Sequence, residues 1–254
     1  MSTIMALSLV LLAVMVLVGG RKGALAFLSL WLNFGCLFLA IVLISVHFSP
    51  LLVTLILGIL MLALTIFVGQ DDLMTTQTAF FAAVLVLLIL LALIMPVEHW
   101  AAVQGFGMED SDELEGLSLL VGINFVKVSI ATAVLSTLGA IAEAAMAIAA
   151  GLSELIQQHP TIETRALFTA GMHVGQQIIG TTFNTLFFGF FGGFLGLFIW
   201  FADLQYTWGE LLNNKVLDAE LILVLFSLIS VILTVPMTTW VMAQRLQIMR
   251  KKQD

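Results

Sequence analysis

Long apolar segments follow one another along almost the whole chain, and this pattern limits the fold more than any other feature. A helix that crosses a membrane needs about 20 mostly apolar residues. Segments that meet or approach this length lie at residues 3–19, 24–46, 51–69, 77–95, 117–138 (extending to 155), 181–202 and 219–241. The sequence therefore predicts one integral membrane domain over residues 1–254, an all-α bundle of about seven transmembrane helices.

The scarcity of charged residues excludes a soluble globular protein. Only 10% of the 254 residues are charged and 61% are hydrophobic, whereas about a quarter of the residues in a soluble domain are charged. So few charges could not cover a globular surface, and the lipid bilayer is the expected surrounding of most of the chain. Nucleic-acid binding is not expected, because no basic patch is interleaved with aromatic residues.

The basic residues indicate the orientation of the helices. No basic residue precedes the first apolar segment and no small-residue cleavage site follows it, so we expect a retained span with the N-terminus outside. Seven spans then place the C-terminus in the cytoplasm and the acidic loop 96–116 outside. The basic residues that face the cytoplasm in this topology are Arg21, Lys22, Arg165, Arg245, Arg250, Lys251 and Lys252. Such a bias is typical of cytoplasmic loops.

The fifth apolar segment is too long for a single span. A continuous helix over residues 117–155 would extend roughly 60 Å, about twice the thickness of the hydrocarbon layer. We expect it either to protrude into the cytoplasm or to break, with Gly139 as the best candidate for a break.

Glu143 lies in this segment among alanines, in the run GAIAEAAMAIAAG. A carboxylate near the bilayer core usually contacts a cavity, a partner residue or water. Glu143 is therefore a candidate contact for a proton, a cation or a substrate. Alternatively, it lies at the cytoplasmic edge of the membrane and is simply solvated.

A polar stripe enters the sixth span. At 100° per residue His173, Gln177 and Asn184 lie within about 40° of one another on a helix, with Thr181 at the margin of this face. A polar stripe normally faces away from lipid, which cannot satisfy its hydrogen bonds. The stripe either lines a path for a substrate or ion, or forms hydrogen bonds between helices.

Glycines follow the polar stripe at the spacing of a helix-packing motif. Gly189, Gly192, Gly193 and Gly196 contain two overlapping G-x-x-x-G spacings, which allow two helices to approach closely. We expect a packing surface here, within the subunit or between subunits.

Signatures of enzymes, cofactors and metal centres are absent from the sequence. The four histidines have no metal-ligand spacing, and no nucleotide-binding or hydrolase motif occurs. Cys36 is the only cysteine, so no disulfide can form within the chain. We therefore expect no enzymatic activity, no cofactor and no metal.

The same region carries a resemblance to a known family. The runs LGAIAEAAMAIAAGLSEL and LFTAGMHVGQQIIGTTFNTLFFGF resemble the signature of the YibE/F family of bacterial membrane proteins, over about residues 138–190. The short N-terminal region is similar to the shorter, YibF-like member. The resemblance implies a multi-pass protein of the bacterial plasma membrane that acts with a longer homologous subunit, and it implies no particular activity.

Two functions fit these observations. In the first, the chain is a permease-like or transporter-like subunit whose polar path is lined by Glu143, His173, Gln177, Thr181 and Asn184. In the second, it is a scaffold or regulatory subunit that transports nothing, and its stripe and glycines form an assembly surface. The partner is the longer subunit or another copy of this chain.

Overall fold

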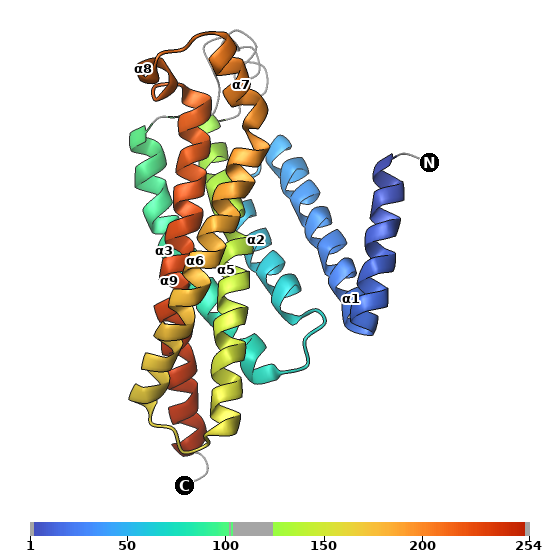
Figure 1. The fold of residues 1–254 in the computed structure, drawn as a ribbon, viewed down its shortest axis with the longest axis vertical. Coiled ribbons are helices and arrows are strands. Elements are labelled where there is room, and N and C mark those ends of the chain that lie inside the picture. Colours follow the sequence, from blue (N-terminus) through green and yellow to red (C-terminus); the bar gives the residue numbers. More distant parts are fainter. Residues whose placement is uncertain (1–2, 102, 104–123, 252–254) are drawn as a thin grey trace.

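The computed structural model describes residues 3–101, 103 and 124–251, and this part of the chain consists of helices and their connections without a β-strand (Figure 1). The helices are α1 (Thr3–Ser45), α2 (Pro50–Phe67), α3 (Leu73–Ala101), α5 (Phe125–Gln158), α6 (Thr164–Gly193), α7 (Leu195–Asp203), α8 (Trp208–Leu211) and α9 (Lys215–Lys251). The predicted all-α fold class is confirmed. Most of the predicted acidic loop lies outside the described residues.

Five of the described helices, α1, α2, α3, α5 and α9, are long and apolar enough to cross a membrane. Helices α6 and α7 would add a sixth span if they are taken together, although they are bent by 49° at the break between them. Helix α1 has 43 residues, about twice the length that one span needs. The predicted number of seven spans depends on how these segments are divided, and both the number and the orientation stay predictions.

Helix α1 is divided by a sharp break at Gly20. The backbone there has φ 54° and ψ −133°, which glycine adopts easily because it has no Cβ. Figure 1 shows that the two halves form a V and that the second half lies beside α2. Ser29 Oγ donates a hydrogen bond of 3.0 Å to the Leu64 carbonyl of α2. The first half lies away from the rest of the bundle.

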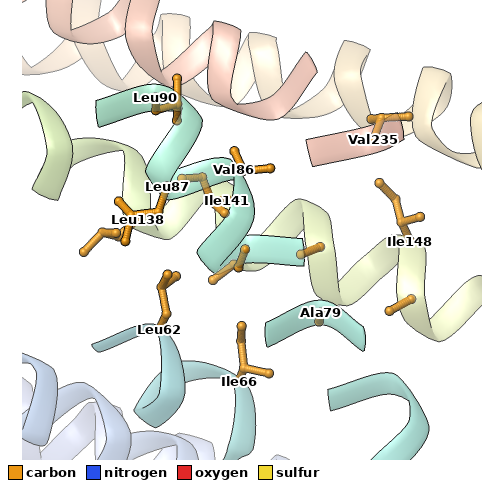
Figure 2. Close-up of a cluster of buried hydrophobic side chains, with 14 of the residues drawn as sticks. Leu62, Ile66, Ala79, Val86, Leu87, Leu90, Leu138, Ile141, Ile148 and Val235 are labelled. Carbon is orange, nitrogen blue, oxygen red and sulfur yellow. The ribbon is translucent and has the colours of Figure 1, made fainter. Parts of the chain in front are cut away.

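The core lies between α3, α5 and α9, with α2 and α6 packed around it. Leu87 and Leu90 of α3, Ile141 and Ile148 of α5 and Val235 of α9 are buried in one cluster (Figure 2). Lipid is as apolar as these side chains, so their burial in a membrane yields little hydrophobic free energy. Close packing and hydrogen bonds between helices must therefore hold the bundle together.

Helix α5 continues from Phe125 to Gln158 without interruption. Of the two alternatives expected for this segment, a break at Gly139 is therefore wrong and a long continuous helix is found. The Asn124 side chain caps its first turn by accepting a hydrogen bond of 3.0 Å from the Lys127 amide. At 1.5 Å per residue its 34 residues extend about 51 Å. Such a helix protrudes beyond a hydrocarbon layer of about 30 Å.

Several other helices also extend beyond the ranges expected from hydropathy. Helix α6 begins at Thr164, upstream of the predicted span 181–202, and α7 completes that span after the bend at Phe194. Helices α3 and α9 continue through Pro96 and Pro236. A proline removes one backbone hydrogen bond, and neighbouring helices in a membrane bundle compensate for that loss.

The bundle has two ends, which different connections form. One end, here called the C-terminal end, contains the turn of α1, the connections α2–α3 and α5–α6, and the last turn of α9 (Figure 1). The other end, here called the α8 end, contains α8 and the adjoining ends of α3, α5, α7 and α9. Lys22 at the turn of α1 forms an ion pair of 3.2 Å with Asp71 of the α2–α3 connection, so these two segments meet at the C-terminal end.

Candidate functional site

The predicted polar stripe lies on an exposed side of α6. His173, Gln177, Thr181 and Asn184 are all exposed. Thr181 Oγ1 donates a hydrogen bond of 3.0 Å to the Ile178 carbonyl, and Asn184 Nδ2 donates one of 3.0 Å to the Gly180 carbonyl. These two side chains thus use the backbone of their own helix, which supplies acceptors where no other partner is present.

Glu143 is exposed on α5, the helix that runs beside α6. Ala140 and Ala144, its neighbours in sequence, are buried against Ile178 and Ile179 of α6 in a small cluster that also includes Val231 of α9. The sequence Ala-x-x-Glu-Ala therefore directs its alanines toward α6 and its glutamate away from that contact.

Helical geometry places Glu143 and the polar stripe on the same side of the α5–α6 pair. The two helices are antiparallel (Figure 1), and Val174 lies 3.6 Å from the position that a Cβ on Gly151 would occupy. Glu143 directly precedes Ala144, which faces α6, and His173 directly precedes Val174, which faces α5. On each helix the preceding residue is rotated by 100° about the helix axis relative to the residue that faces the partner. Because the two helices run in opposite directions, these two rotations point Glu143 and His173 to the same side of the pair.

Glu143 and part of the polar stripe also lie at a similar height along the axes of α5 and α6. Glu143 is eight residues from Gly151 (151 − 143), and Thr182 is eight residues from Val174 (182 − 174). Glu143 therefore lies near the level of Thr181 and Asn184. We call Glu143, Ala147, Ala150, His173, Gln177, Gly180, Thr181 and Asn184, all exposed, the α5–α6 polar face. The structure brings together the residues of the predicted path, on the outside of the described bundle.

The predicted glycine packing surface has open space beside it within the described part of the chain. A Cβ placed on Gly189, Gly192, Gly193 or Gly196 would meet no atom within 4 Å. The contact within the subunit uses two glycines further upstream. A Cβ on Gly171 would lie 2.6 Å from two Thr239 side-chain atoms, and one on Gly175 would lie 2.1 Å from Cγ1 of Val235. The G-x-x-x-G motif of residues 171–175 thus allows α6 to pack closely against α9.

Sequence reasoning missed a polar cluster at the C-terminal end of the bundle. The Asp72 carboxylate, just before α3, accepts hydrogen bonds from Thr75 Oγ1, from the Met74 amide at 2.9 Å and from Ser153 Oγ of α5 at 2.9 Å. The run DDLMTTQT could have suggested a capped helix start, but not the contact with Ser153. This cluster ties α3 to α5.

Arg245 of α9 completes this cluster. Its Nη2 donates a hydrogen bond of 2.7 Å to Gln77 Oε1, and its guanidinium carbon lies 5.5 Å from the centre of the Phe81 ring. Both partners are on α3, so Arg245 ties α9 to α3. The cluster therefore connects the three helices that form the core, and we assign it a structural role.

The Asp72 contacts predict a pH-dependent stability. The hydrogen bond from Thr75, together with those from Ser153 and Met74, holds the pKa of Asp72 below its ordinary value, although burial acts in the opposite direction. A lowered pKa means that the stabilisation is present above the unfolded-state pKa of about 3.9 and is lost as pH falls toward the folded-state pKa.

We expect Asp72→Asn to lower the thermal unfolding midpoint in detergent near neutral pH, and the difference from wild type to shrink as pH falls below about 4. Asp71→Asn is the matched control, since Asp71 is exposed and pairs with Lys22 at the surface. A difference between wild type and Asp72→Asn that is independent of pH would contradict this assignment.

The described residues contain no group of three or more His, Cys, Asp or Glu side chains that could hold a metal ion. Hydroxyl groups buried along α9 bond to their own helix: Ser230 Oγ donates to the Ser227 carbonyl and Thr234 Oγ1 to the Ser230 carbonyl, both at 2.7 Å. Ser230 and Thr234 thus bond to their own helix inside the bundle, whereas the polar side chains of the α5–α6 polar face are exposed.

A model of the family described as YibE/F-like protein matches residues 7–248, which is nearly the whole chain. No curated protein and no solved structure matches the chain.

Proposed function

The chain belongs to the YibE/F-like family of membrane proteins, and from this premise we propose that it is a permease-like subunit of the bacterial plasma membrane. Its polar path is lined by the α5–α6 polar face and is completed by a second subunit. The observation that carries this proposal is the exposure of Glu143, His173, Gln177 and Asn184 on one side of the helix pair α5–α6.

Lipid cannot surround this face without a large energetic cost. An acidic residue at the centre of a membrane helix costs about 2.5–3.5 kcal/mol or more, and any polar group left without a hydrogen bond in lipid adds to that cost. Glu143 lies near the level of Asn184, and its neighbours on the same side are small, since Ala147, Ala150 and Gly180 leave room beside it. A water-filled path or a partner helix would remove the cost.

A path between subunits fits better than a path through this subunit. The centre of the described bundle consists mainly of Leu, Ile, Val and Ala side chains, and most of the buried hydroxyls of α9 bond to its own backbone. The family resemblance suggests a longer homologous subunit as the partner, and a second copy of this chain is the alternative that cross-linking would reveal.

Solute flux into proteoliposomes tests the proposal. We expect Glu143→Ala and Asn184→Ala to lower flux at least about tenfold, which corresponds to about 1.4 kcal/mol in the barrier. Gln177→Ala and Gln176→Ala form a matched pair, because both glutamines are exposed and Gln176 lies outside the polar face. A loss of flux should follow only Gln177→Ala.

The panel of solutes tested for flux should contain protons, monovalent cations and small organic anions. Each should be measured with the chain reconstituted alone and with its longer homologue. Wild-type flux that both Glu143→Ala and Asn184→Ala leave unchanged would refute the assignment of the path.

A scaffold or regulatory subunit is the second candidate, and the open glycines of α6 and α7 favour it. Gly189, Gly192, Gly193 and Gly196 have free space where a Cβ would lie, so a helix of another chain could approach them closely. If Gly192→Leu abolished co-purification with the longer homologue while no member of the solute panel moved, this function would replace the permease-like one.

A further inference from the structure

Glu98 is the only buried acidic or basic residue among the described residues. It lies in the last turns of α3, at the α8 end of the bundle, and only 3% of its surface is exposed. Helix α3 is apolar enough to cross a membrane, and an ionisable residue within such a helix usually indicates a functional site. The polar face described above does not include Glu98.

One hydroxyl group binds the Glu98 carboxyl group. Ser129 Oγ of α5 donates a hydrogen bond of 2.7 Å to Glu98 Oε2. No ion pair reaches Glu98 within the described part of the chain. Glu98 and Ser129 lie beside members of the apolar core cluster in sequence, namely Val97 on α3 and Val126 and Ile130 on α5.

The charged groups of the neighbouring helices do not neutralise Glu98. On α5 the nearest cation in sequence is Lys127, which is exposed and lies two residues from Ser129. The first turns of α9 contribute two more acids, Asp218 and Glu220, along with the exposed Lys215. Helix α2 contains no charged residue, and His99 of α3 is exposed.

These surroundings favour the protonated form of Glu98. An ionised carboxylate that is removed from water without a cation is strongly destabilised, and a proton removes this cost. The hydrogen bond from Ser129 acts in the opposite direction, because it stabilises the ionised carboxylate. The site can therefore exist in both protonation states.

The position of the site allows exchange with water. Glu98 is three residues from the end of α3 at Ala101. Pro96, two residues earlier, has no amide hydrogen to donate to the carbonyl of Ala92, so this end of α3 has one backbone hydrogen bond fewer than a regular helix. The last turns of α3 can therefore move more easily than its centre.

We propose that Glu98 is a proton-binding site, which takes up and releases one proton at the α8 end of the bundle with Ser129 as its hydrogen-bond donor. This site is a property of this chain alone and does not depend on the permease-like function. If that function holds, the proton is the ion that drives transport, and Glu98 carries it at a location separate from the α5–α6 polar face.

Infrared difference spectroscopy on the full chain in lipid nanodiscs tests the proposal directly. We expect wild type to show the C=O stretch of a protonated carboxyl group at pH values above about 4.3, the ordinary pKa of glutamate, where an exposed glutamate is ionised. This band should disappear reversibly as pH is raised further, and it should be absent from Glu98→Gln. Lys127→Gln and Glu143→Gln are the controls and should retain the band.

Two results would overturn the proposal. A band that Glu98→Gln leaves unchanged would show that Glu98 does not hold the proton. A Glu98 band that persists at every pH until the protein unfolds would show a permanently protonated structural group that releases nothing. Neither result depends on solute flux, so failure of the proton site is distinguishable from failure of the permease-like function.

A second variant covers the case in which Glu98→Gln does not fold. Ser129→Ala removes a hydrogen bond that supports the ionised carboxylate, so the midpoint at which the band disappears should move to higher pH by about one unit, a tenfold change in proton affinity. A midpoint that is unchanged in Ser129→Ala would contradict the role assigned to this pair.

Discussion

Replacing Gly175 by alanine is expected to lower the free energy of unfolding by about 1–3 kcal/mol, the usual cost of forcing an extra methyl group into a filled contact. The added Cβ would lie 2.1 Å from Cγ1, 2.8 Å from Cγ2 and 3.0 Å from Cβ of Val235. Val235 is fully buried in the core and is β-branched, so its χ1 angle has little freedom to adjust. Helix α6 would have to move away from α9.

At Gly180, on the same helix, replacement by alanine is not expected to lower the free energy of unfolding. Nothing lies within 4 Å of the position of a Cβ there, and alanine favours a helix over glycine by up to about 1 kcal/mol. Gly180→Ala should therefore be neutral or stabilising. Thermal unfolding in one detergent compares the two variants directly.

A compensating change on α9 should reveal the cause of the loss. Val235→Ala removes both methyl groups that clash with the new Cβ, so Gly175→Ala should cost less in that background than in wild type. Equal unfolding midpoints for Gly175→Ala and Gly180→Ala would show that the α6–α9 contact is looser than the structure indicates.

The two glycine motifs illustrate what the sequence could and could not predict. The spacing of residues 171–175 equals that of residues 189–193, yet only the first pair contacts α9. A local spacing shows that close approach is possible. It does not show whether another helix of the same chain passes at that level, since this depends on the path of a segment some sixty residues away (235 − 175).

Helix type was predictable because a membrane leaves few alternatives. Backbone groups in lipid need internal partners, so long apolar segments become helices. The ends of helices were less predictable. Hydropathy detects the part of a helix in lipid and stops where polar residues begin, although α5, α6 and α9 continue beyond that point. The break at Gly20 lies between the predicted spans 3–19 and 24–46, but hydropathy could not indicate which of the residues between them would break the helix.

The candidate site was predictable only in part. Helical periodicity predicted that His173, Gln177 and Asn184 share one face. The structure places this face on the same side of the α5–α6 pair as Glu143, with Asn184 near the level of Glu143. Whether this face carries a solute stays a prediction. The contacts of Asp72 with Ser153 and of Glu98 with Ser129 join residues of separate helices, and no pattern within one segment indicates which distant residues will meet.

Replacing Arg245 by methionine is the second large effect that we expect. Methionine retains an unbranched apolar side chain beside Phe81 but loses the hydrogen bond of 2.7 Å to Gln77 and the guanidinium above the ring. A hydrogen bond of a charged group contributes about 1.5–3 kcal/mol, and a cation–π contact about 0.5–2 kcal/mol. The free energy of unfolding should fall by about 2–4 kcal/mol, because α9 loses its tie to α3.

A double-mutant cycle with Gln77 separates this tie from general effects of removing a charge. Arg245→Met and Gln77→Met should each destabilise the protein, and the double variant should lose about 1–2 kcal/mol less than the sum of the two. Lys251→Met, at an exposed position in the last turn of α9, removes a charge without such contacts and should change stability by less than about 0.5 kcal/mol. Additive losses in the cycle would show that Arg245 and Gln77 do not interact, and that α9 is held against α3 by packing alone.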